Sequence, residues 1–313
     1  MRETTNPTPV AYDPDMSLAG LLREKWEDNP SKVQWERKTS LGSQWLPVTV
    51  DQFVAEVRQA AKGLVASGVE PGDRVGIMSR TRYEWTLLDF AAWWVGAIPV
   101  PIYETSSQDQ MEWIVGDAGV SLLFAENRSQ AEMARALGDR APLLREALVI
   151  DDGAIPELNV RGQAVDDDVV EQRSRATKGD DVATIIYTSG TTGRPKGVLL
   201  WHRNFVFLAK SGRIGFADVC DKPYSRTLLF MPLAHVFARF IEVLAVATNT
   251  VLAHSPDVKN LIADVGTFKP TYLLAVPRVF EKIYNSADAK AGHGAKLKLF
   301  RWAAKTAIAY SRA

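Results

Sequence analysis

The sequence predicts an α/β fold in which largely parallel sheets are flanked by helices, and two observations support this class. Short runs of β-branched or apolar residues alternate with longer segments whose apolar residues recur every three or four positions. The short runs are apolar on both faces, which is typical of strands in a parallel sheet covered by helices. Strands are expected at 73–78, 97–102, 120–125, 146–151, 182–187, 226–231, 249–253 and 271–276.

The segments between these runs have the spacing of amphipathic helices. Over residues 50–68, apolar side chains recur at three-to-four spacing from Phe53 to Val65, and Gly68 supplies a helix stop. The most apolar stretch, 90–103, is about fourteen residues long, whereas a bilayer span needs roughly twenty, so we expect a buried helix that runs into a strand. Further helices are expected over 82–97, 108–119, 127–138 and 235–247.

A polar stretch from about residue 151 to 181 separates two groups of expected strands. It has no convincing apolar face and is expected to be a connection. We therefore place a domain boundary near residue 180. Residues 1–180 would form a first α/β lobe, and residues 181–313 a second, incomplete lobe that contains the most distinctive motif of the chain.

Charge balance and cysteine content narrow the function classes. The 313 residues include 37 basic and 37 acidic side chains, so the net charge gives no sign of a field that gathers nucleic acid. Cys220 is the only cysteine, which excludes an internal disulfide and leaves the four histidines without thiolate companions for a zinc site. The first twenty residues lack the apolar core of a signal peptide. A cytoplasmic location without a transmembrane segment is expected.

The segment 187–198, YTSGTTGRPKGV, directly follows an expected buried strand, where α/β proteins place ligand sites. Gly190, Gly193 and Gly197 allow sharp turns and a close approach of the backbone to a ligand, and successive N–H groups in such turns bind anions. Lys196 adds a positive charge. Hydroxyl donors are supplied by Thr188, Ser189, Thr191 and Thr192. Each hydrogen bond to a charged oxygen contributes on the order of 1.5–3 kcal/mol, so the segment could hold a polyphosphate.

The alternative interpretation of this segment is a plain surface turn. The density of hydroxyl groups and the lysine after a buried strand favour phosphate binding instead. Spacing excludes two other motifs. The lysine lies between Pro195 and Gly197, which does not fit G-x-x-x-x-G-K-[ST], and Ser189 follows Tyr187 and Thr188, which does not fit G-x-S-x-G.

The same segment matches, residue for residue, the phosphate-loop signature of the adenylate-forming superfamily, which includes acyl-CoA synthetases, luciferases and peptide-synthetase adenylation domains. MPLAHVFARF at 231–240 resembles the next motif of that superfamily, in the form found in long-chain fatty-acid:CoA ligases. Residues 72–107, 201–205 and 269–285 also resemble these ligases, particularly the actinobacterial ones. The resemblance runs from about residue 18 to the end of the chain.

This resemblance implies a two-step reaction with ATP, magnesium, a fatty acid and coenzyme A. The fatty-acid carboxylate attacks the α-phosphate of ATP, and the thiol of coenzyme A then attacks the acyl-adenylate. No side-chain nucleophile is needed, so catalysis consists of positioning and charge stabilisation. Thr188 would lie nearest the magnesium. The residues implied to contact the phosphates are Thr188, Ser189, Gly190, Thr191, Thr192, Gly193 and Lys196.

His235 matches a motif position that lies beside the adenylate and the acyl entrance in this family, and it is the candidate catalytic residue. Its implied role is to orient the substrate carboxylate or the adenylate, since no acidic partner is visible that would make it a base. A packed or exposed structural histidine is the alternative. Arg239 lies one helical turn beyond and is kept only as a secondary candidate, because most arginines are at the surface.

Other polar motifs are expected to be structural. His202 and Arg203 are expected to begin and cap a helix, and Pro277 and Arg278 to lie between a strand end and a helix start. The tryptophans between residues 85 and 94 are expected in the core rather than in a ligand cage. The acidic run VDDDVV is expected to be a solvated turn rather than a metal site.

The chain departs from the family pattern in its extent. Later family motifs, which hold adenine, magnesium and ribose and supply a catalytic lysine on a C-terminal domain, are not found in 286–313, where the residues from 295 onward have an amphipathic helical pattern. The chain is therefore expected to be the N-terminal portion of a ligase, without the C-terminal domain. Such a fragment is expected to bind substrate poorly and not to turn over.

Two other classes stay open at this point. One is another adenylate-forming enzyme that acts on an aryl or amino acid, and the other is a non-catalytic nucleotide-binding module. The oligomeric state and peripheral contact with a membrane are left undecided by the sequence.

Overall fold

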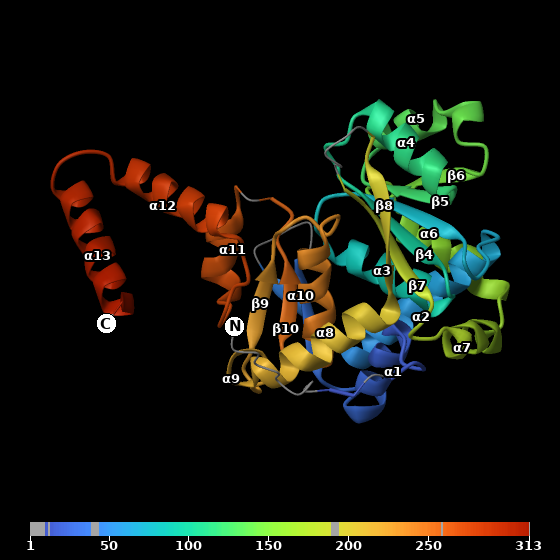
Figure 1. Cartoon of the computed structure of the whole chain (residues 1–313), viewed down its shortest axis with the longest axis horizontal. Helices are drawn as coiled ribbons and strands as arrows, with labels where there is room; N and C mark the ends of the chain where they lie inside the picture. Colours follow the sequence, from blue (N-terminus) through green and yellow to red (C-terminus); the bar gives the residue numbers. More distant parts are fainter. Residues whose placement is uncertain (1–9, 12, 39–43, 189–193, 258, 313) are drawn as a thin grey trace, which may run out of the picture. The chain divides into compact units, whose positions relative to one another are not determined.

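A computed structural model describes residues 10–11, 13–38, 44–188, 194–257 and 259–312. The chain divides into two compact units, Met1–Leu273 and Leu274–Ala313. In its described part, the first unit contains two four-stranded sheets, a two-stranded hairpin and the helices that surround them (Figure 1). The boundary expected near residue 180 stays a prediction; strands from both sides of that position share one sheet.

One sheet has the strand order β4-β3-β5-β6, and all of its neighbouring strands are parallel. All four were expected, and every residue of β5 is buried, which explains why its sequence is apolar on both faces. Pro99 and Pro101 lack a backbone N–H, so β4 suits the edge of the sheet. The strands are β3 (Arg74–Met78), β4 (Ile98–Ile102), β5 (Val120–Ala125) and β6 (Glu146–Val149).

The other sheet has the order β2-β1-β10-β9. Strand β10 is parallel to both β1 and β9, whereas β2 is antiparallel to β1. Strands β9 and β10 were expected, but β1 and β2 were not, because β1 buries only Gln34 and Trp35 and has no apolar run. The bounds are β1 (Val33–Lys38), β2 (Trp45–Thr49), β9 (Arg226–Leu229) and β10 (Val251–His254).

The prediction of a strand at 271–276 is wrong. In this range the described backbone forms a single isolated bridge, between Tyr272 and Thr227 of β9. The residues are half-buried or exposed, so this apolar run does not gain the burial that would stabilise a central strand.

Strands β7 (Val182–Thr188) and β8 (Lys196–Trp201) form an antiparallel hairpin. The expectation at 182–187 is confirmed by β7, whereas β8 was missed because its first residues were taken as part of the loop. The hydroxyl of Thr184 on β7 donates to the carbonyl of Pro99 on β4 at 2.7 Å, which holds the hairpin beside the edge of the parallel sheet. The described ends of the segment 187–198 thus lie on the two strands of a hairpin.

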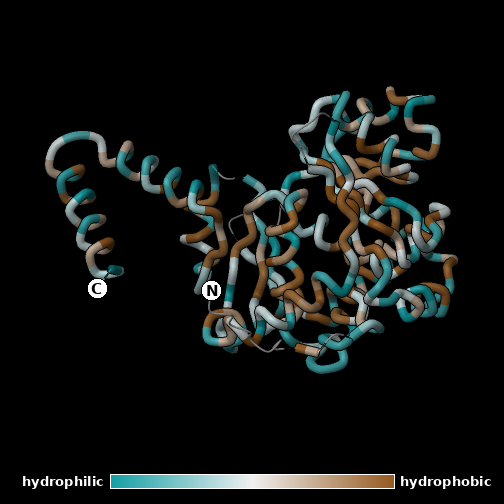
Figure 2. The backbone as a smooth tube through the Cα atoms, in the orientation of Figure 1, coloured by the Kyte–Doolittle hydropathy of each residue, from teal (hydrophilic) through white to brown (hydrophobic). Residues whose placement is uncertain are grey.

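The expected helices are confirmed, and the apolar residues follow the strands and the faces that pack on them (Figure 2). Helix α2 begins with a capping box of Thr49 and Gln52. Trp85, Trp93 and Trp94 on α3 are fully buried, which confirms their assignment to the core. These helices are α2 (Val50–Ala66), α3 (Tyr83–Trp94), α4 (Gln108–Ala118), α5 (Arg128–Arg135) and α10 (Val236–Ala247).

Besides α6 and α7, which are described below, four more helices lie in the described part of the first unit, and two lie in that of the second. The first unit also contains α1 (Leu18–Asp28), α8 (His202–Gly215), α9 (Ala217–Cys220) and α11 (Leu261–Phe268). The second unit consists of α12 (Pro277–Ala291), with the expected proline in its first turn, and α13 (Ala295–Arg312), which was also expected.

The polar stretch 151–181 is not a plain connection, because it forms α6 (Ala154–Arg161) and α7 (Asp167–Ala176). Leu158 on α6 is fully buried, and a Cβ added at Gly63 of α2 would lie only 2.3 Å from its carbonyl oxygen. On α7, Val170 is fully buried and Asp166 caps the helix, so the run VDDDVV is a helix start rather than a turn. Each helix buries only one or two apolar side chains, which is why no apolar stripe marked them.

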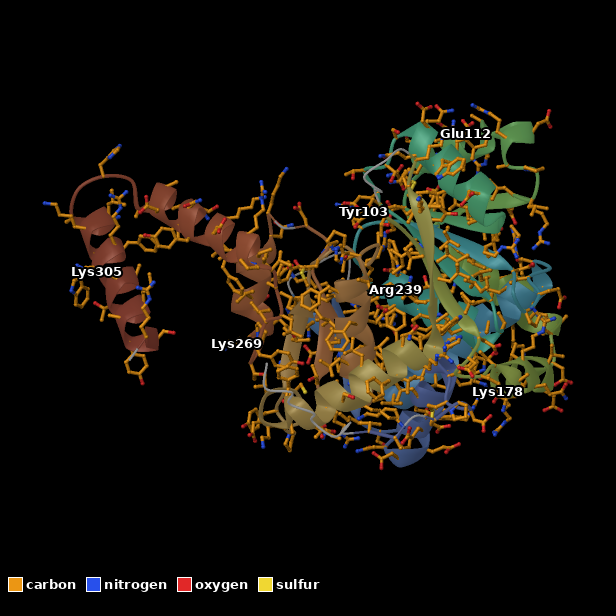
Figure 3. The ribbon with its side chains drawn as sticks, in the orientation of Figure 1. Tyr103, Glu112, Lys178, Arg239, Lys269 and Lys305 are labelled. Carbon is orange, nitrogen blue, oxygen red and sulfur yellow. The ribbon has the colours of Figure 1, made fainter. Side chains whose placement is uncertain are left out.

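A buried polar network crosses the first unit, and Arg239 on α10 is at its centre (Figure 3). The Arg239 and Asp89 side chains are fully buried and form an ion pair of 2.8 Å, which joins α10 to α3. Arg239 also donates to the hydroxyl of Thr184 on β7 at 2.9 Å. Arg239 was kept only as a secondary site candidate because surface arginines are common, but its side chain is fully buried. No local pattern could predict this burial, because Asp89 is 150 positions away from Arg239.

Glu242, one turn beyond Arg239, is the second carboxyl group of this network. It is fully buried beside Asp89 and Thr86, and burial followed by the negative charge of Asp89 raises its pKa well above the usual value. Thr86 in turn contacts Nε2 of His254 on β10 at 2.8 Å. With Glu242 protonated, one arginine faces one ionised carboxylate, and the buried charges balance.

Two substitutions test this charge assignment. Arg239→Met should lower the free energy of unfolding by about 3–5 kcal/mol, because it leaves Asp89 buried without a counter-charge. Glu242→Gln should be tolerated, because glutamine resembles the protonated acid.

The raised pKa of Glu242 also fixes the sign of a pH effect. The protonated Glu242 contributes its full stability at pH values below the pKa that this carboxyl group has in the unfolded chain. That contribution is lost as the pH rises toward the higher pKa that the group has in the folded protein. Because glutamine cannot ionise, Glu242→Gln should gain stability relative to wild type as pH rises from about 5 to about 8. Urea denaturation followed by circular dichroism measures this difference, and parallel pH profiles for the two proteins would contradict a protonated Glu242.

Candidate functional site

The structure places two of the expected phosphate-binding residues opposite each other. Thr188 ends β7 and Lys196 begins β8, and the two are cross-strand partners with exposed side chains. The other five lie outside the described residues: Ser189, Gly190, Thr191, Thr192 and Gly193. A hydroxyl and an ammonium group thus stand opposite each other on the two strands of the hairpin.

Helix α4 holds both ends of this turn. The Tyr187 hydroxyl donates to Asp117 at 2.5 Å, and the Trp113 ring nitrogen donates to the carbonyl of Pro195 at 2.7 Å. The guanidinium of Arg194 lies over the Trp113 ring, 4.7 Å from its centre. Trp113 and Asp117 are four residues apart on α4 and therefore share one face of the helix. Burial and the Asp117 carboxylate raise the pKa of Tyr187, which keeps its hydroxyl as a donor.

Sequence reasoning missed these contacts. Trp113 and Asp117 precede the hairpin by about seventy residues, and nothing in their spacing points to a loop so far along the chain. Helix α4 itself was expected, and it is firmly bounded by the Ser107–Gln110 capping box and by Gly119 in the left-handed conformation. The turn is therefore anchored to a well-defined element.

His235 lies at the N-cap of α10 with an exposed side chain. Its Nδ1 accepts a hydrogen bond from the backbone of Phe237 at 3.2 Å. A neutral imidazole that accepts at Nδ1 carries its proton at Nε2, so Nε2–H is the donor left for a ligand. This arrangement suits the expected role of orienting an anionic group and does not make His235 a base.

Thr81, which follows β3, fixes the segment that leads to His235. Its hydroxyl donates to the carbonyl of Met231 at 2.6 Å and accepts from the backbone N–H of Leu233 at 3.2 Å. Arg239 then ties α10 to β7 through Thr184, four residues before Thr188. The histidine and the hairpin are thus attached to one buried framework, although their separation along the chain gave no sign of it.

His202 begins α8 as expected, but it is a core residue and not a cap. It is 1% exposed, and its Nδ1 accepts from the backbone N–H of Leu18 at 3.2 Å. Burial lowers its pKa to about 3, so the ring is neutral at physiological pH. The structural interpretation of this histidine is confirmed.

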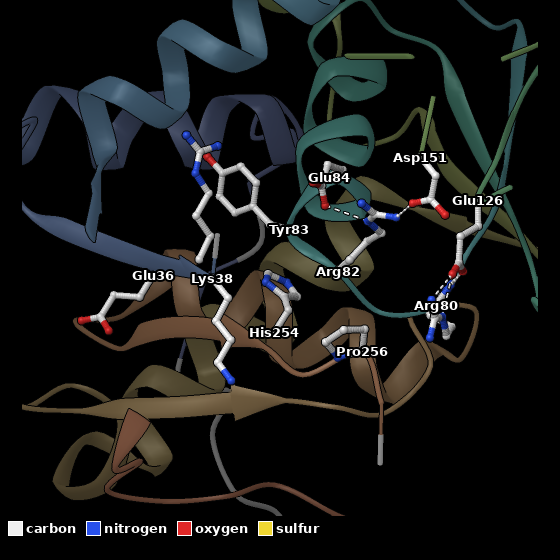
Figure 4. Close-up of a pocket in the computed structure, with 11 residues that line it drawn as sticks. Glu36, Lys38, Arg80, Arg82, Tyr83, Glu84, Glu126, Asp151, His254 and Pro256 are labelled. Atoms are coloured by element: carbon white, nitrogen blue, oxygen red, sulfur yellow. Dashed lines mark hydrogen bonds and ion pairs between the residues drawn. The ribbon is translucent and has the colours of Figure 1, made fainter. Parts of the chain in front are cut away.

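A hollow of about 370 Å³ lies where β3, β5, β6 and β10 end (Figure 4). Arg80 binds Glu126 at 2.6 Å, and Arg82 binds Glu84 at 2.8 Å and Asp151 at 2.7 Å. Burial lowers the pKa of His254 at its edge to about 4. The charges that line this hollow neutralise one another, so it is not a built anion site. Charged residues after successive strands were the unused sequence signal for it.

Metal and membrane features can be judged in the described part of the chain. There, no group of three or more histidine, cysteine, aspartate or glutamate side chains is arranged to hold a metal ion. None of the described helices is long and apolar enough to cross a membrane.

The sequence profile of the AMP-binding enzyme family matches residues 24–308. The chain belongs to the AMP-binding enzyme family. Long-chain-fatty-acid–CoA ligases named FadD15 from Mycobacterium bovis and Mycobacterium tuberculosis are 42% and 41% identical to it over 316 residues. These alignments cover 100% of this chain and 52% of each relative, so the chain spans about half the length of the curated relatives it matches.

Solved structures of AMP-binding enzymes share the fold. The inhibitor-bound N-terminal domain of FACL13 from Mycobacterium tuberculosis is 25% identical, with a TM-score of 0.72 over 85% of this chain and 64% of that one. An O-succinylbenzoate–CoA synthetase from Bacillus subtilis, solved with AMP, is 20% identical, with a TM-score of 0.71 over 89% of this chain and 52% of that one. The expected fold, an N-terminal domain of an adenylate-forming enzyme, is confirmed.

The anchoring of the turn by α4 can be tested by proteolysis. Trp113→Leu removes a hydrogen bond and a cation–π contact, together worth about 1–2 kcal/mol, so cleavage after Lys196 by trypsin should become roughly 5- to 30-fold faster. The matched control is Trp201→Leu. Trp201 is the last residue of β8, at the end far from Lys196, and the guanidinium of Arg203 lies 4.0 Å from the centre of its ring. Equal cleavage rates in the two variants would contradict the anchoring role of Trp113.

Proposed function

We propose that this chain is the nucleotide-binding part of a long-chain fatty-acid:CoA ligase, with a fatty acid, ATP and coenzyme A as substrates. One observation carries the proposal: the family signature YTSGTTGRPKGV spans a hairpin turn whose ends are anchored, with Thr188 and Lys196 facing each other across it. The identity to long-chain-fatty-acid–CoA ligases along the whole chain supports the substrate class. A cytoplasmic location is part of this proposal.

The proposed roles of Thr188 and Lys196 follow from the charge that develops during the first reaction step. When the carboxylate of the fatty acid attacks the α-phosphate, negative charge builds up on the departing pyrophosphate. Lys196 and the hydroxyl of Thr188 would hold the β- and γ-phosphates and stabilise that charge. Magnesium, when bound, would neutralise phosphate oxygens. It would be held mainly by the nucleotide, and the exposed hydroxyl of Thr188 could contribute one further oxygen ligand.

His235 would position the acid. Its Nε2–H donor can hold a carboxylate or adenylate oxygen, while the Nδ1 contact to Phe237 fixes the ring at the start of α10. The thiol of coenzyme A would attack the acyl carbonyl in the second step, and no side chain of this part needs to form a covalent bond to the substrate.

Calorimetric titration of the chain with ATP and magnesium tests the proposal. Lys196→Ala should weaken binding by about 10- to 150-fold, because a hydrogen bond to a charged oxygen is worth about 1.5–3 kcal/mol. The control is Lys178→Ala, an exposed lysine that pairs with Asp15 in another part of the first unit. Binding that Lys196→Ala leaves unchanged, or that both variants weaken equally, would contradict phosphate binding at the hairpin.

A further inference from the structure

A hollow of about 590 Å³ lies between α1, α8 and the last turn of α10, at the end of α10 opposite to His235 (Figure 1). Its walls include the buried aliphatic side chains of Leu21, Val246 and Ala247. The hollow is therefore separate from the phosphate hairpin and from His235, and the proposed ligase reaction gives it no role.

Lys25 on α1 lines this hollow and is half-buried. Its Nζ donates to the carbonyl of Thr248, the residue that follows α10, at 2.7 Å. Among the described residues, the Lys25 amine contacts this carbonyl oxygen and no carboxylate. A neutral amine can make the same contact with one N–H and keep a lone pair for another partner.

The neighbouring carboxylates are engaged with other cations. Glu24, which also lines the hollow, binds Lys210 of α8 at 3.0 Å. Asp221 binds Arg213, the other basic residue of α8 in the wall, at 2.9 Å. Lys25 is thus a cation in a crowded basic region whose counter-charges are largely taken.

These surroundings favour the neutral form of Lys25. Burial, followed by repulsion from Lys32 and Arg213, lowers its pKa to about 8. Attraction by Asp28 and Asp221 acts in the opposite direction and is weaker. At pH 7.5 about a quarter of such amines are neutral, whereas only about one in a thousand ordinary lysines is.

We propose that Lys25 is a site of N-acylation by an acyl thioester, with the acyl group lying in this hollow. The lone pair of Nζ attacks the thioester carbonyl, a C–N bond forms and the C–S bond breaks. The proton lost from the nitrogen goes to the departing thiolate, so the products are an amide and a free thiol. A lysine that is desolvated or lies beside another cation is an activated nucleophile for such a step.

The end of α10 favours an uncharged product. The carbonyl groups at the C-terminus of a helix carry partial negative charge, so a carbamate formed from carbon dioxide would place an anion beside Thr248. An amide is neutral, keeps one N–H to donate to that carbonyl, and ends the repulsion between Lys25 and Lys32. The aliphatic walls of the hollow suit a short alkyl chain on the amide. This inference goes beyond the proposed ligase reaction and does not depend on it.

Incubation of the folded chain with acetyl-CoA at pH 7.5, followed by peptide mass spectrometry, tests the proposal. Lys25 should be acetylated at least about 10-fold faster than Lys62, because far more of its amine is neutral. Lys62 is the matched comparison, since it is also half-buried but pairs with Asp167 at 3.0 Å. The advantage of Lys25 should disappear near pH 10, where ordinary lysines also lose their protons.

One variant and one change of solvent separate the effect of the fold from that of the local sequence. Arg213→Gln should slow acetylation of Lys25 roughly 3-fold at pH 7.5, because it removes a repelling charge and frees the carboxylate of Asp221. In concentrated urea, Lys25 and Lys62 should react at equal rates. Equal or slower acetylation of Lys25 in the folded chain, an advantage that persists in urea, or an unchanged or faster rate in Arg213→Gln would overturn the proposal.

Discussion

The buried ion pair between Arg239 and Asp89 is the interaction on which the first unit depends. It joins α10 to α3, and through Thr184 and Pro99 it reaches the hairpin and the edge of the parallel sheet. On the other side, Glu242 and Thr86 extend the polar contacts to His254 of the mixed sheet. A buried ion pair adds little net stability compared with apolar packing, but removing one partner is costly. We interpret the network as a device that fixes the relative positions of these elements.

This constraint explains how a site can be assembled from distant segments. The described ends of the hairpin strands are held by α4 on one side and by the Arg239 network on the other. His235 begins the helix that carries Arg239, and Thr81 holds the segment before it. The polar groups that would meet phosphate are exposed, whereas the groups that position them are buried. This division suits a reaction in which the protein orients charges and forms no covalent bond.

Much of this arrangement could be predicted from local patterns, and the failures have identifiable causes. Helices α2 and α3 and strand β5 carry periodicities that fix their type, and the phosphate signature needs no tertiary information. Strand β1 and helices α6 and α7 were missed because each buries only one or two side chains. The burial of Arg239 and the contacts of Trp113 could not be predicted, because their partners lie about seventy or more residues away. The apolar run at 271–276 was wrongly predicted as a strand. Its composition favours a strand, but its described backbone forms only one isolated bridge with a neighbouring strand.

Because one buried network holds both the hairpin and the start of α10, the two should respond together to nucleotide. Hydrogen–deuterium exchange of the full chain, with and without ATP and magnesium, measures this directly. Exchange should become slower in peptides covering β7, β8 and the first turn of α10 and should not change in α13. Protection confined to the hairpin or to other elements, or no protection at saturating nucleotide, would contradict it.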